Sequence, residues 1–245
     1  MTGGRAGGNV CVNVLRLLTL GGLGIESDDG SVAPRLRPPR LALLAVLAAA
    51  GERGVSRERL AALFWPDADE EHARHSLRQA RYALRNDLGR EVVRSDAATL
   101  HIDDSAICAD ICDFRAALAA GDRARAISLV RGPFLDGIYL PGASAFERWA
   151  EEERARITGA TTSALLSLAT EATRTNDLDA AVEWWRQLTD VDSLNGRFAL
   201  GYLKALASRG DRAAALSFAR RSRIRSLNAA MKLVPPAAQR SSKMR

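Results

Sequence analysis

The first hundred residues alternate between strand-like and helix-like patterns of apolar positions. Apolar and polar residues alternate over 12–20, which is typical of a β-strand with one buried face. Residues 24–36 predict a hairpin around Asp28-Asp29-Gly30. Residues 91–103 contain two short β runs on either side of a turn at 96–98. We therefore expect strands at both ends of this region.

Three helices are predicted between these strands. A proline pair suits the first turn of a helix that runs to about Ala50. Ser56 is a favourable N-cap for a short second helix, which the next proline ends. The third helix covers 73–89, and Gly89 is placed to end it. The predicted order is strands, three helices, hairpin.

From Asp110 onward the pattern is helical, with helices expected at 110–130, 143–174, 177–190, 195–208 and 211–226. Two segments in this half, "NDLDAAVEWWR" (176–186) and "GDRAAALSFAR" (210–220), align at an offset of 34 residues. A 34-residue period of paired helices is the tetratricopeptide signature, and a generic helical bundle is the alternative. Trp184 is expected in the core of this repeat, whereas Trp185 could stack on a ligand or join the core.

The helix at 73–89 has two unlike faces. Arg74, Arg78, Arg81 and Arg85 fall within roughly 60° of one another around the helix axis. The opposite face is apolar and consists of Ala73, Leu77, Ala80, Leu84 and Leu88. A packed helix with a cationic outer face suits the major groove of DNA, although a solvated arginine face is the commoner use of such a pattern.

The net charge of +6 is unevenly distributed along the chain. Residues 1–109 hold 14 Arg and Lys against 14 Asp and Glu, whereas residues 220–245 hold eight cations and no acid. The basic isoelectric point therefore reflects the end of the chain and does not by itself indicate nucleic-acid binding. Local charge is more informative, because four acids in 67–71 precede five arginines in 72–90.

The chain also excludes several classes of protein. The chain has three cysteines, a small and odd number that argues against a disulfide framework and indicates a reducing cytoplasm. The apolar runs are shorter than the ~18 residues that a membrane span needs. Asn13 and Arg16 interrupt the apolar stretch near the start, so we do not predict a signal peptide.

Other chemistry is weakly supported. His72 and His75 could form a zinc site with Cys108 and Cys112, but the pairs come from different elements, and surface histidines with buried cysteines are the favoured interpretation. The chain contains neither a phosphate-binding G-x4-G-K-[ST] loop nor a G-x-S-x-G nucleophile motif. The acidic run at 151–153 is expected to be a solvated helix face. We predict no metal, no cofactor and no enzymatic activity.

The order of these motifs resembles the Streptomyces antibiotic regulatory protein (SARP) type of transcriptional activator. The segments that carry the resemblance are "LRLLTLGGLGIE" (15–26), "RLALLAVLAAAGERGVSRERLAALFWPDAD" (40–69), "ARHSLRQARYALRNDLG" (73–89), "AICADICDFRAALAAGD" (106–122), "RGPFLDG" (131–137) and "FERWAEEERAR" (146–156). Members of this family have an OmpR-type winged helix followed by a bacterial transcriptional activator domain. The resemblance thus implies an α+β N-terminal winged helix-turn-helix followed by an all-α tetratricopeptide-like helical repeat domain.

The expected parts are a flexible leader at 1–11, the winged helix at 12–104, the activator domain at 105–227 and a basic tail at 228–245. The resemblance implies that the family's recognition helix corresponds to 73–89 and its wing to 92–102. The DNA-contact candidates are then Arg74, His75, Arg78, Arg81, Tyr82, Arg85 and, on the wing, Arg94. The loop thought to face RNA polymerase in the family corresponds here to Pro66, Asp67, Asp69, Glu70 and Glu71. The turn "SDAAT" departs from the family because it lacks the usual glycine.

The sequence therefore predicts a cytoplasmic, sequence-specific DNA-binding transcriptional activator that reads the major groove with helix 73–89. Its partners would be double-stranded DNA and RNA polymerase, without a membrane. The helical repeat domain would serve self-association or partner contact, and a homodimer suits tandem half-sites. The main alternative is a tetratricopeptide adaptor whose winged helix does not bind DNA.

Overall fold

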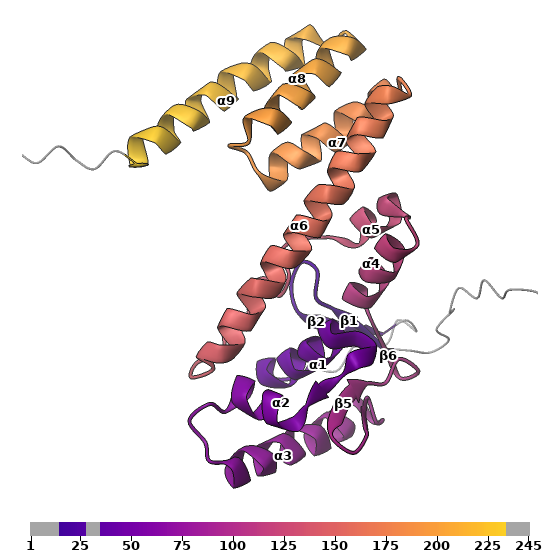
Figure 1. Cartoon of the computed structure of the whole chain (residues 1–245), viewed down its shortest axis with the longest axis vertical. Coiled ribbons are helices and arrows are strands. Elements are labelled where there is room, and N and C mark those ends of the chain that lie inside the picture. The colour runs from indigo at the N-terminus through magenta and orange to yellow at the C-terminus, as the bar shows by residue number, and fades with distance from the viewer. Residues whose placement is uncertain (1–14, 28–34, 234–245) are drawn as a thin grey trace, which may run out of the picture. The chain divides into compact units, whose positions relative to one another are not determined.

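The computed structural model describes residues 15–27 and 35–233, with side chains described as far as Ser222. The chain divides into two compact units, Met1–Thr161 and Thr162–Arg245, and the division falls within helix α6 (Ser144–Arg174). The expected leader at 1–11, the turn at Asp28-Asp29-Gly30 and the part of the basic tail beyond 233 lie outside the described residues. Small sheets in the first unit precede a long run of helices (Figure 1).

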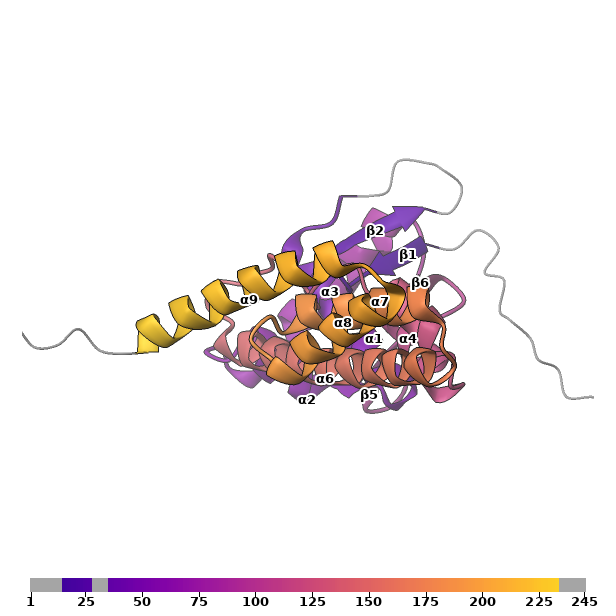
Figure 2. The same ribbon diagram turned by 90° about the horizontal axis from the view of Figure 1, so that it is seen from above.

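The first sheet has the strand order β2-β1-β6. β1 (Leu15–Leu18) pairs antiparallel with β2 (Gly24–Ser27), and the two lie side by side in Figures 1 and 2. β1 also pairs in parallel with β6 (Ile107–Ala109), a strand that the sequence pattern did not predict. The described partner of β2 is therefore β1. The expected hairpin required a strand that ends at residue 36, but residues 35–37 do not form a strand.

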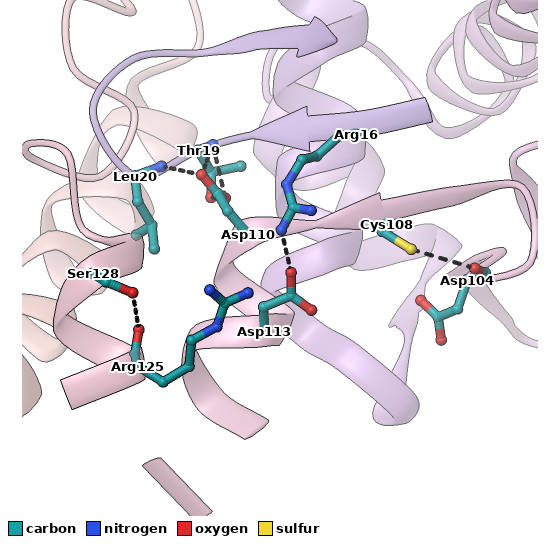
Figure 3. Close-up of polar contacts among 9 residues, drawn as sticks. All are labelled: Arg16, Thr19, Leu20, Asp104, Cys108, Asp110, Asp113, Arg125 and Ser128. Atoms are coloured by element: carbon teal, nitrogen blue, oxygen red, sulfur yellow. Dashed lines mark hydrogen bonds and ion pairs between the residues drawn. The ribbon is translucent and has the colours of Figure 1, made fainter. Parts of the chain in front are cut away.

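A buried carboxylate joins this sheet to the next helix (Figure 3). Asp110, the first residue of α4 (Asp110–Ala119), is 4% exposed and accepts hydrogen bonds from the backbone N–H of Thr19 at 2.9 Å and of Leu20 at 3.0 Å. The Thr19 hydroxyl donates to the same carboxylate, and Arg16 pairs with Asp113 one turn along α4. These hydrogen bonds compensate for the burial of the Asp110 carboxylate, and they hold the end of β1 against α4.

Three helices follow β2, and the capping residues that the sequence predicted for them are confirmed. α1 (Pro38–Ala50) begins with proline in its first turn and is buried along nearly its whole length. α2 (Arg57–Phe64) is capped by Ser56, whose hydroxyl accepts from the N–H of Arg59 at 3.2 Å. α3 (Glu70–Leu88) begins one turn earlier than predicted, because Asp69 caps it, and ends at Gly89 in the left-handed conformation.

The second sheet has the strand order β3-β5-β4 and is antiparallel throughout. β4 (Val93–Ser95) and β5 (Thr99–Ile102) form the hairpin predicted at 91–103, and β3 (Val55–Ser56) precedes α2. The hairpin follows α3 in the sequence. Because β5 contacts α1, the hairpin packs on the same core as the helices. This small sheet holds the hairpin beside the helices.

The core of the first unit continues past the expected boundary at 104. α4, α5 (Arg123–Leu129) and the start of α6 contribute to the same buried cluster that contains α1 and α3. The rings of Phe64 on α2 and Phe146 on α6 are 5.4 Å apart, and Phe146 lies 5.6 Å from Trp149. The segment 131–142 also contributes to the core, because it buries Phe134 in this aromatic cluster. The N-terminal elements and residues up to Ile157 therefore share one core.

The second unit contains α7 (Leu178–Val191), α8 (Gly196–Arg209) and α9 (Arg212–Leu233), coloured orange to yellow in Figures 1 and 2. α7 contacts α8, and α8 contacts α9. The aligned aspartates of the repeat have one role, because Asp177 and Asp211 each accept from the backbone N–H three residues later. The expected tail positions 228–233 continue α9. In the described residues, no helix is at once apolar enough and long enough for a bilayer span.

Both tryptophans of the repeat pack against the core of the second unit. Nε1 of Trp185 donates to the Thr173 hydroxyl at 3.2 Å, and its ring lies over Gly201 of α8. Phe218, aligned with Trp184 in the sequence repeat, is buried edge-on against Tyr202. The sequence left open whether Trp185 stacks on a ligand or joins the core, and in the structure its ring packs against the core.

We expect Gly201→Ala to destabilise the second unit, because overpacking costs about 1–3 kcal/mol. The better helix propensity of alanine offsets up to ~1 kcal/mol of this cost. A methyl group at Gly201 would lie 2.3 Å from Cε3 of Trp185, a ring that Thr173 also holds in place. Urea unfolding of the full chain measures the change. Gly196→Ala is the matched control, because nothing lies within 4 Å of its Cβ position. Equal stability of the two variants would contradict the prediction.

Candidate nucleic-acid interface

α3 presents the two faces that its sequence predicts. Ala73, Leu77, Leu84 and Leu88 are buried against the core of the first unit. The exposed side carries Arg74, His75, Arg78, Tyr82 and Arg85. Tyr82 is 68% exposed, a high value for an aromatic ring on a packed helix. The structure therefore brings five of the six helix candidates to one open surface.

Two of these arginines have no protein partner for their guanidinium groups within the described part of the chain: Arg78 and Arg85. Arg74 pairs with Glu70 one turn earlier, and both side chains are more than half exposed. Such an exposed pair contributes little to stability and is easily exchanged for another anion. His75 interacts with Gln79 at 2.7 Å. The surface thus offers unpaired or weakly paired cations.

Arg81 differs from its neighbours because its side chain is only 28% exposed. Its Nη2 donates to the carbonyl of Val93 on β4 at 3.5 Å and lies 3.8 Å from Glu91. Its Nε is buried without a hydrogen-bond partner. Arg81 therefore connects α3 to the hairpin, a position that helical spacing alone could not reveal.

The hairpin carries one predicted site residue and is held by one that the sequence missed. Arg94 on β4 is 62% exposed, with its Nε 3.7 Å from Asp103. Arg57 at the start of α2 donates to the carbonyls of Asp96 at 2.9 Å and Ala97 at 2.8 Å. These bonds brace the turn that lacks the expected glycine. No sequence signal joins Arg57 to a turn some 40 residues later, because only the folded chain brings them together.

The arginines of α2 and α3 surround one hollow of about 120 Å³. Its lining consists of Arg57, Arg74, Arg78 and Arg81 with two leucines, and it includes no acidic residue. Guanidinium groups with fixed geometry bind phosphate oxygens through paired hydrogen bonds. Three of the four lining guanidinium groups already bind protein oxygens, so Arg78 is the lining arginine left to bind an anion beside α2 and the hairpin.

The acidic segment before α3 is part loop and part helix. Pro66 and Asp67 are exposed ahead of the helix, whereas Glu70 and Glu71 form its first turn. Asp69 accepts from the backbone N–H of His72 at 2.9 Å, and this bond is the main cause of its lowered pKa. Carboxylates at this end of a helix interact favourably with its dipole. This capping role explains part of the acidic cluster without requiring a contact with another protein.

The residues weighed as a zinc site make separate contacts. His72 bonds to Asp69, and the Cys112 thiol donates to the carbonyl of Ala48 at 3.5 Å. Burial raises the pKa of Cys112 to about 11, which disfavours the thiolate that zinc requires. In residues 15–27 and 35–233, no group of three or more His, Cys, Asp or Glu could hold a metal ion.

Comparison with protein families decides the class of protein. The family described as the bacterial transcriptional activator domain matches residues 104–240, more than half of the chain. The chain belongs to this family. The resemblance to SARP-type transcriptional activators that the motifs indicated is thereby confirmed.

A solved structure shares the fold. Mycobacterium tuberculosis EmbR, in complex with a low-affinity phosphopeptide, superposes with a TM-score of 0.57 at 23% sequence identity. The match covers 86% of this chain and 59% of the EmbR chain. At this identity the likeness establishes the fold alone. None of the curated proteins matches the chain.

Proposed function

We propose that this activator binds DNA through a winged helix formed by α1, α2, α3 and the β4–β5 hairpin. Helix α3 enters the major groove, and the hairpin is the wing. The observation that carries the proposal is the exposed face of α3, where Arg78 and Arg85 lack protein partners in the described chain beside a hollow lined by four arginines. A helix of this kind, buried on its other face, fits the width of the groove.

The candidate residues then divide by role. Arg78 and Arg85 contact phosphates or guanine edges, and Arg74, His75 and Tyr82 extend this surface. Arg94 on the hairpin reaches a phosphate or the minor groove. Arg81 and Arg57 act as positioning residues, because their hydrogen bonds already connect α3 and α2 to the hairpin. Phosphate contacts set affinity, and base contacts set sequence preference.

Activation would follow from contact between RNA polymerase and the segment from Pro66 to Glu71, which is exposed throughout. The family domain at 104–240 would support self-association, including a homodimer on tandem half-sites. We propose no catalytic step and no cofactor, and a cytoplasmic location, where bacterial DNA lies. The proposal requires only non-covalent binding.

Selection of genomic fragments by the purified full chain tests the proposal, followed by binding measurements over a range of salt concentrations. We expect a preferred sequence and a logarithm of affinity that falls linearly with the logarithm of salt concentration. Arg78→Ala/Arg85→Ala should lose most of this binding. Arg123→Ala/Arg125→Ala is the charge-matched control and should keep it, because both arginines lie on α5 and are exposed. Absence of salt-dependent DNA binding would overturn the proposal in favour of a protein adaptor.

We expect Arg57→Ala to loosen the wing and to weaken DNA binding several-fold without removing a base contact. The substitution removes the side chain that binds the carbonyls of Asp96 and Ala97. Hydrogen exchange at the hairpin amides measures this directly, and protection should fall there more than in α1. Arg59→Ala is the control, since Arg59 lies on the same helix without contacting the turn. Unchanged hairpin protection would contradict a positioning role for Arg57.

A further inference from the structure

A cleft of about 870 Å³ lies in the first unit, and its lining includes no residue of α3. The cleft is formed by α1, the start of β3 and α2, helix α4 and the first half of α6. Its volume is within the ~300–1,000 Å³ range of pockets that enclose small molecules. The proposed DNA contacts leave this cleft unused.

The inner wall of the cleft is apolar. Val46 of α1, Phe114 of α4 and Ile157 of α6 are buried side chains that line it, together with the ring of Trp149. Alanines at 49, 50 and 160 leave space between the helices. An apolar or aromatic body would remove this wall from water and be stabilised by the hydrophobic effect.

The polar lining of the cleft is strongly cationic. Arg53, Arg59, Arg115 and Arg156 contribute four positive charges, and Glu153 contributes the one carboxylate among its lining residues. Glu153 was expected on a solvated face, but its side chain is 8% exposed and binds Arg115 at 3.2 Å and Arg156 at 2.5 Å. The lining therefore keeps a formal charge of +3, from four arginines and one glutamate.

Two of the four cations are uncommitted. The guanidinium groups of Arg53 and Arg59 form no hydrogen bond or ion pair with any side chain or carbonyl that the structure describes. Arg115 and Arg156, by contrast, are oriented by a buried carboxylate. The cleft therefore combines arginines that lack protein partners with an apolar wall. This combination suits a ligand with an anionic head and an apolar body.

We propose that the cleft is a binding site for a small amphipathic anion, a carboxylate, sulfonate or phosphate carried on an aromatic or acyl body. Arg53 and Arg59 bind the anionic group, and the wall around Phe114 and Ile157 encloses the body. α1 and α2 belong to the proposed DNA-binding part, whereas α4 and α6 belong to the matched family domain. A bound ligand would contact both and is placed to act as an effector.

Fluorescence titration of the full chain with anilinonaphthalene sulfonate tests the site without DNA. We expect saturable binding of one probe per chain and much weaker binding of the uncharged parent, phenylnaphthylamine. Arg53→Ala/Arg59→Ala should weaken probe binding about tenfold or more, because charge-assisted hydrogen bonds are lost. Arg123→Ala/Arg125→Ala removes the same charge elsewhere and should leave the affinity unchanged.

Ala160→Trp fills the cleft from the surface of α6 and provides a second variant. We expect it to abolish saturable probe binding, while the circular dichroism spectrum and melting temperature stay those of the wild type. The proposal is overturned if the wild type shows no saturable binding, if both variants bind as tightly as the wild type, or if the uncharged parent binds equally well. These outcomes are independent of DNA binding, so failure here and failure of the proposed function are distinguishable.

Discussion

Arg78→Ala is expected to weaken binding to the selected DNA by about 5- to 150-fold, the effect of losing ~1–3 kcal/mol from one contact with a base or phosphate. The Arg78 guanidinium is exposed and has no partner in the described chain, so its loss should leave the free energy of unfolding within about 0.5 kcal/mol of wild type. Fluorescence anisotropy with a labelled operator fragment measures the affinity, and urea unfolding measures the stability.

The salt dependence of the Arg78→Ala variant separates two kinds of contact. Loss of a phosphate contact lowers the salt slope by about one and weakens all sequences alike, whereas loss of a guanine contact relaxes the preference at one position. Arg81→Ala is the informative comparison, because Arg81 also binds the hairpin and its loss should reduce stability as well. An Arg78→Ala variant with wild-type affinity on every sequence would refute the assignment of α3 as the reading helix.

Phe146→Ala is expected to destabilise the first unit by about 3–5 kcal/mol, the usual cost of deleting a buried aromatic ring. Phe146 is fully buried, and its ring lies beside those of Phe64 and Trp149. Since Phe64 belongs to α2, DNA binding should fall together with stability although Phe146 is remote in sequence from the arginines. Urea unfolding with circular dichroism measures the loss.

Tyr139→Ala is the matched control for this aromatic deletion. Tyr139 lies in the same stretch of chain but is 71% exposed, so its removal should change the free energy of unfolding by no more than about 0.5 kcal/mol. A Phe146→Ala variant as stable as Tyr139→Ala would mean that the aromatic cluster does not join α6 to the helices of the first unit.

Local signals predicted the helices around the site because each signal acts within a few residues. Ser56 begins α2 through a bond to the N–H of a residue three positions later, Gly89 ends α3 through its own backbone angles, and both act as expected. The apolar spacing of α3 likewise fixed which of its sides is buried. Elements and faces of this kind can be derived from sequence alone.

Long-range pairings were not predictable in the same way. β6 has three residues and was missed because its parallel partner, β1, lies about 90 residues earlier. Arg57 and Arg81 bind the hairpin through backbone carbonyls, which leave no trace in side-chain patterns. The buried Glu153 was misjudged for a related reason, since its partner Arg115 on α4 and its place in the cleft are set by helix packing. Its other partner, Arg156, is local and lies three residues later on α6.

The shared core of the first unit limits how this protein can be recombined. The family domain begins at residue 104, yet β6, Asp110 and Phe146 lie beyond that point and complete the sheet and core of the preceding elements. A fragment cut at 104 would expose the edge of β1 and the apolar side of α1. Exchange of the proposed DNA specificity between relatives should therefore proceed by substitution on the surface of α3, or by transfer of the whole segment up to Thr161.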